Sequence, residues 1–146
     1  MSLFFGGEKK EAVLFSPLEG KITFEGKPAV GAKINLWIKW KDKKGEHFGF
    51  TADENGFFHI PQKVAIYKEN PLAQIVITQE ITVEYDNENY LIWTLSKSNT
   101  HQFGELGGKP SNLTCELTTE EMDTHLEYAL MGTLCKWDKL TKVSEK

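Results

Sequence analysis

Apolar and polar residues alternate along the first half of the chain with the period of a β-strand. Ile22 and Phe24 share one face of the first clear run. In the run 32–40 every second residue is apolar, which places Trp37 on the opposite face from Ile34, Leu36 and Ile38. A helix would spread the same residues around its circumference, so the pattern predicts strands.

Glycine, proline and asparagine separate these runs. We predict turns at Gly26–Pro28, at the charged segment Lys41–Glu46 and at Asn55–Gly56, because these residues tolerate positive φ or lack an N–H for a ladder. Alternation returns at residues 79–85 and, after a polar turn, at 90–95. The pattern is typical of antiparallel hairpins.

Near the C-terminus the pattern changes. Thr118 and Thr119 precede two glutamates, as at a capped helix start, so we expect about two helical turns reaching Tyr128. Residues 1–11 suit a flexible leader, and 12–15 a first edge strand. We therefore predict an all-β, antiparallel Greek-key β-sandwich of about 7–9 strands in one domain, 12–146, with one short helix near the C-terminus.

Two stretches resemble a known family. The order GKITFEGKPAVGAKINL followed by TADENGFFHIP resembles the carboxypeptidase-regulatory-like, or transthyretin-like, β-sandwich and small bacterial proteins built on it. The matching positions are Gly20, Gly26, Pro28, Gly31, Ala32, Thr51, Asp53, Gly56, Phe58 and Pro61. Ala52 departs from the pattern, since it stands between the threonine and the aspartate. These are scaffold positions, so the resemblance implies a fold and no active site.

Composition narrows the classes of partner. The 146 residues carry a formal net charge of −4, and all 17 basic residues are lysine. Because arginine supplies the bidentate contacts to guanine and phosphate, we expect no nucleic-acid partner. No stretch reaches the roughly 18–20 apolar residues of a membrane span, and the N-terminus lacks a secretory pattern, so we expect a cytoplasmic protein. Periplasmic or exported is the alternative if a leader was removed.

The two cysteines leave two interpretations open. Cys115 and Cys135 lie in two runs that read as strands; if these pair, a disulfide can form, and otherwise both remain reduced and buried. The four histidines lack the spacing of a metal site, and no nucleophile motif is found. We therefore expect no cofactor, no metal and no enzymatic activity.

Aromatic residues are the remaining candidates for function. We expect a binding face that uses Trp37, Trp40, Phe57 and Trp93. The first hypothesis is a non-enzymatic protein-interaction module, accessory or toxin-neutralising, that is a monomer or a homodimer. The second is a carbohydrate-binding module with stacking tryptophans, and the third is a small transthyretin-related hydrolase.

Overall fold

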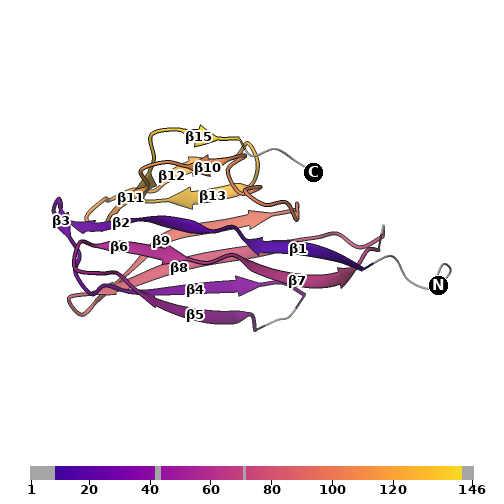
Figure 1. Cartoon of the computed structure of the whole chain (residues 1–146), viewed down its shortest axis with the longest axis horizontal. Coiled ribbons are helices and arrows are strands. Elements are labelled where there is room, and N and C mark those ends of the chain that lie inside the picture. Colours follow the sequence, from indigo (N-terminus) through magenta and orange to yellow (C-terminus); the bar gives the residue numbers. More distant parts are fainter. Residues whose placement is uncertain (1–8, 42–43, 71, 143–146) are drawn as a thin grey trace.

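The computed structural model describes residues 9–41, 44–70 and 72–142. These residues form fifteen strands and include no helix. The strands build one large and one smaller sheet and two short ribbons (Figure 1). The protein is therefore all-β and sandwich-like, as the alternation predicts, but the prediction of about 7–9 strands is too low, because short strands also form in segments without regular alternation.

The larger sheet has six strands and is antiparallel throughout. Its order is β12-β13-β9-β8-β4-β5. The strands are β4 (Lys33–Lys39), β5 (Glu46–Thr51), β8 (Ile77–Tyr85), β9 (Glu88–Lys97), β12 (Asp123–His125) and β13 (Leu130–Thr133).

The smaller sheet is centred on β2 and is mixed. Its members are β2 (Leu18–Phe24), β3 (Lys27–Pro28), β6 (Phe57–Ile60), β11 (Thr114–Glu116) and β14 (Cys135–Lys136). β11 runs parallel to β2, which corrects the prediction of a wholly antiparallel sandwich, and the other pairs are antiparallel. Two ribbons complete the fold: β1 (Lys9–Phe15) with β7 (Lys63–Lys68), and β10 (Lys109–Pro110) with β15 (Leu140–Thr141).

The core lies between the inner faces of the two sheets. Ile34, Leu36 and Ile38 of β4 are buried, while their neighbours on the same strand are exposed or half-buried. Ile22 of β2 and Phe58 of β6 belong to the same buried cluster. The period of two therefore separates one buried face from one uncovered face on β4 and β6.

Two predictions at the chain ends are corrected. The expected helix is absent: residues 123–125 form β12, which pairs with β13 at the edge of the large sheet. A two-turn helix is marginal alone, whereas the sheet edge supplies backbone partners. The strand β1 begins at Lys9, inside the predicted leader, because β7 pairs with it from Lys68 onward. Residues 1–8 lie outside the described residues.

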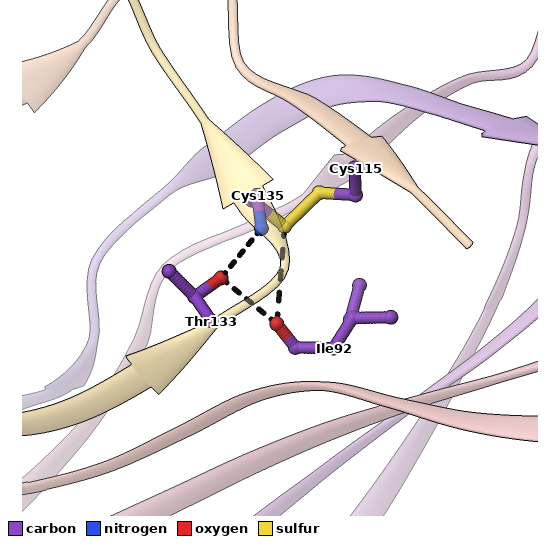
Figure 2. Close-up of a disulfide and its surroundings, with 4 residues drawn as sticks. All are labelled: Ile92, Cys115, Thr133 and Cys135. Carbon is purple, nitrogen blue, oxygen red and sulfur yellow. Dashed lines mark hydrogen bonds between the residues drawn. A yellow bond between two sulfur atoms is a disulfide. The ribbon is translucent and has the colours of Figure 1, made fainter. Parts of the chain in front are cut away.

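Cys115 and Cys135 are joined by a disulfide. They face each other where β11 pairs with β14, and their Cα atoms are 4.0 Å apart. Figure 2 shows the bridge beside Thr133 and Ile92. Thr133 Oγ1 donates to the Ile92 carbonyl at 2.8 Å and accepts from the Cys135 N–H at 2.9 Å. The bridge therefore joins the two ends of the segment 115–135, which contains β12 and β13 of the large sheet.

Candidate functional site

The four aromatic residues expected to form one binding face lie in four different places. Trp93 is 2 % exposed and lies in the core, where its indole N–H donates to Gln79 Oε1 at 3.0 Å. It is not available to a ligand. The reason is an irregularity in β9: Ile81 faces Trp93 while Thr82 faces Leu91, so Ile92 is an extra residue that shifts the alternation.

Trp40 and Phe57 line two separate grooves. Trp40 stacks edge-on against Tyr67 with ring centroids 5.4 Å apart, in a groove of about 930 Å³ beyond the end of β4. Lys41 Nζ lies over both rings and occupies their faces. Phe57 is 52 % exposed on the outer face of the smaller sheet, in a groove of about 910 Å³, with Lys21 Nζ 5.6 Å from its ring centroid.

Trp37 lies on the outer face of the large sheet, the side away from the core. Its neighbours across the ladder are His47 on β5 and Glu80 on β8. The indole N–H donates to the Lys44 carbonyl at 3.0 Å, which fixes the ring orientation. Gly45, at φ 73°, allows this arrangement, because a Cβ there would lie 2.5 Å from the indole nitrogen.

Polar side chains surround Trp37. Asn35 and His47 form a hydrogen bond, with Nδ2 and Nδ1 3.0 Å apart. Together with Glu80 and Thr82 they line a shallow depression of about 330 Å³ around the indole. A second depression of about 380 Å³ adjoins it, since Asn35 and Thr82 line both. We call Asn35, Trp37, His47, Gly49, Glu80 and Thr82 the polar strip.

Gly49 stands in the middle of the polar strip. It pairs with Asn35 inside the edge strand β5, and a Cβ built on it would have no atom within 4 Å. Neither packing nor a positive φ explains this glycine, although glycine weakens a strand. Its effect is to leave a gap between the side chains of His47 and Thr51, which opens the second depression. The signal in the sequence is a glycine inside an otherwise regular strand, which the alternation of apolar residues does not reveal.

A buried polar cluster crosses the core on the inner face of the same sheet. Glu105 accepts hydrogen bonds from Lys97 Nζ at 3.1 Å and Gln79 Nε2 at 2.8 Å. It also accepts from the N–H and the hydroxyl of Ser16, at 3.0 and 2.6 Å. Lys97 is 1 % exposed, and burial lowers the pKa of its amine although the nearby Glu105 opposes this shift. The cluster ties the irregular segment 98–108 to the sheet.

Neither a metal site nor a membrane helix is found in the described part of the chain. No group of three or more His, Cys, Asp or Glu side chains there is arranged to hold a metal ion. No helix there is long and apolar enough to cross a membrane.

Comparison with known proteins yields one family. Residues 18–120 match the model of a family described as a domain of unknown function, DUF6795. This range includes the whole polar strip and the acceptors and donors of the buried cluster except Ser16. No curated protein and no solved structure matches the chain.

Proposed function

The chain belongs to the DUF6795 family, and we propose that it is a non-enzymatic module that binds an oligosaccharide on the polar strip. The observation that carries the proposal is the position of Trp37, a fixed aromatic ring at the centre of an uncovered polar sheet face. The ring is held by its own N–H, so its π-face needs no reorganisation to receive a ligand.

The surroundings of Trp37 suit a hydroxyl-rich ligand. The C–H face of a sugar ring packs on an indole, while its hydroxyl groups need both donors and acceptors. Asn35 supplies both, Glu80 supplies acceptors, and Thr82 supplies a hydroxyl. Residues two apart on a strand are separated by about 6.7 Å, so the two depressions can hold successive parts of one chain. The gap at Gly49 admits the bulk of the second part.

The test is binding to an array of neutral oligosaccharides, followed by calorimetric titration of each oligosaccharide that binds. We expect Trp37→Ala to weaken binding at least tenfold. Phe57→Ala is the matched control, because Phe57 is an exposed aromatic residue on the other sheet. No binding by the wild type to any oligosaccharide, or equal loss in both variants, contradicts the proposal.

A second candidate, protein interaction, is favoured by the surface of β7. Val64 and Ile66 are 45 % and 65 % exposed, and β7 pairs with β1 but with no other described strand. An uncovered strand with exposed apolar residues is a site where another chain can add a strand. Ile66→Lys should abolish capture of a protein partner or self-association and leave oligosaccharide binding intact.

We further infer that the sandwich has the transthyretin-like Greek-key arrangement that the sequence resembles. The support is the path of the chain: β4 and β5 lie in the large sheet, β6 pairs with β2 in the smaller sheet, and β8 returns to pair with β4. Such crossing between sheets is typical of Greek-key sandwiches. An experimental structure that superposes on a transthyretin-like domain strand for strand would support it.

The disulfide is evidence about the cell compartment in which the protein resides. Disulfides persist in oxidising surroundings and are rare in the cytosol. We therefore propose the periplasmic or exported alternative over the cytoplasmic one. Fractionation of the source cells, with maleimide labelling of the Cys115 and Cys135 thiols, tests this: labelled cysteines in a cytosolic fraction contradict it.

A further inference from the structure

We propose that Lys97 and Gln79 join in an intramolecular amide bond, formed with the help of Glu105. This proposal does not rest on the proposed oligosaccharide binding. It concerns the buried polar cluster on the inner face of the large sheet, where an amine, a primary amide and a carboxyl group meet out of water.

The three groups are brought together by the ladder and by one loop. In the register of β8 and β9, Ile77 faces Lys97 and Gln79 faces Leu95. Gln79 and Lys97 are therefore diagonal neighbours on one face, within reach of long side chains. Glu105 enters from the segment after β9, and one oxygen, Oε2, accepts from both Lys97 Nζ at 3.1 Å and Gln79 Nε2 at 2.8 Å.

Each group has the environment that the reaction needs. An amine attacks only in its neutral form, and Lys97 lies fully out of water, its side chain 0 % exposed, beside a carboxylate that can take its proton. The amide carbonyl of Gln79 is polarised by the indole N–H of Trp93, 3.0 Å from Oε1. Phe15 and Trp93 are both buried beside the cluster, with their ring centroids 6.4 Å apart.

The reaction needs no additional reagent. Lys97 Nζ passes a proton to Glu105, and its lone pair attacks Cδ of Gln79, while the carbonyl electrons move to Oε1, where Trp93 donates. Glu105 then gives its proton to Nε2 and takes one from Nζ. The Cδ–Nε2 bond breaks, ammonia leaves, and the Nζ–Cδ amide remains with Glu105 as the neutral acid. The carboxyl group thus acts as a proton carrier between two nitrogens that it already contacts.

The alternative electrophile for Lys97 is the carboxyl carbon of Glu105 itself. That reaction would release water instead of ammonia. Glu105 receives four hydrogen bonds from donors, including the N–H and hydroxyl of Ser16. A carboxylate is a poor electrophile, since its negative charge opposes attack by the lone pair of an amine. The amide of Gln79, polarised at Oε1, is the better target.

Intact-mass measurement of the purified, denatured and reduced full chain decides the question. We expect the wild type to be lighter than its sequence by one ammonia, and proteolysis to yield one branched peptide that joins Gln79 to Lys97. A mass equal to that of the sequence overturns the proposal, and so does a loss of one water. The measurement uses the wild type, so it does not depend on whether any variant folds.

Two variants and a control assign the roles. Lys97→Met should restore the full mass, and Glu105→Gln should do so although both reacting groups remain. Lys136→Met, at an exposed lysine on β14, should keep the loss of ammonia. Loss of ammonia that persists in Lys97→Met would place the reaction elsewhere and overturn the assignment.

Discussion

The disulfide should supply a measurable part of the free energy of unfolding. Cys115 and Cys135 are 20 residues apart in the sequence, and both are almost completely buried. In the loop-entropy model, a cross-link that closes a loop of this length stabilises the folded state by about 3 kcal/mol. For a domain of this size, 1 kcal/mol shifts Tm by about 2–4 °C, so reduction should lower Tm by roughly 6–12 °C.

The assay separates the cross-link from packing. Wild type is unfolded in urea, reduced, refolded in the presence of a reductant and compared with the oxidised protein by urea titration. Reduction keeps every sulfur atom, so the change in unfolding free energy reports the cross-link alone. The urea slope should also rise, because the reduced unfolded chain exposes more surface.

The double variant Cys115→Ala, Cys135→Ala provides the second comparison. It should be less stable than the reduced wild type, since each deleted sulfur leaves a buried space that costs roughly 1 kcal/mol. Equal urea midpoints for oxidised and reduced wild type would refute the reasoning. They would mean that the segment containing β12 and β13 is already fixed by the pairing of β13 with β9, with or without the disulfide.

Three further predictions concern single residues. Partial burial raises the pKa of Glu116, but hydrogen bonds from Thr118, Gly26 and Thr23 outweigh it and lower this pKa from 4.5 to about 2. Because the folded pKa is below the unfolded one, the stabilisation is present above about pH 4.5 and is lost as the pH falls toward 2. Urea midpoints at several pH values should fall less steeply below pH 4.5 in Glu116→Gln. Gly49→Thr should keep or raise Tm in a thermal melt, since a Cβ there meets no atom and glycine costs a strand about 0.5–1 kcal/mol, but should abolish oligosaccharide binding in calorimetry. Gly45→Ala should lower Tm and shift the tryptophan fluorescence, because the added Cβ displaces the Trp37 ring; an unchanged spectrum would show that the ring is not held there.

Regular alternation made most of the large sheet predictable. The phase of β4 correctly placed Ile34, Leu36 and Ile38 in the core and Trp37 on the other face. Trp93 is a candidate for the binding face only because it is aromatic, with no argument from phase, and the extra residue at Ile92, which no pattern in the sequence marks, places it in the core. The capping residues before the segment 123–125 predict a helix there, but strand pairing with β13 decides its structure.

The buried cluster left a signal in the sequence that alternation can reveal. In β8 the inward positions are Ile77, Gln79, Ile81 and Val83, so Gln79 is the polar exception. In β9 the inward positions after the irregularity are Trp93, Leu95 and Lys97, and Lys97 is again the exception. A polar residue on the apolar face of a strand predicts a buried polar partner. Glu105, however, lies in an irregular segment where no alternation tells which side chains point inward. The partner was therefore not predictable from the sequence.

The proposed bond and the proposed binding face meet on a single strand. In β8, Gln79 points inward to the buried cluster and Glu80 points outward to the polar strip. Thr82, two residues further on, also lines the strip. A bond from Gln79 to Lys97 would hold β8 against β9 directly beneath the outward residues, so their positions would vary less before a ligand arrives. Because preorganisation lowers the cost of binding, Lys97→Met should weaken oligosaccharide affinity without touching the polar strip. Unchanged affinity in a folded Lys97→Met variant would show that the two features are independent.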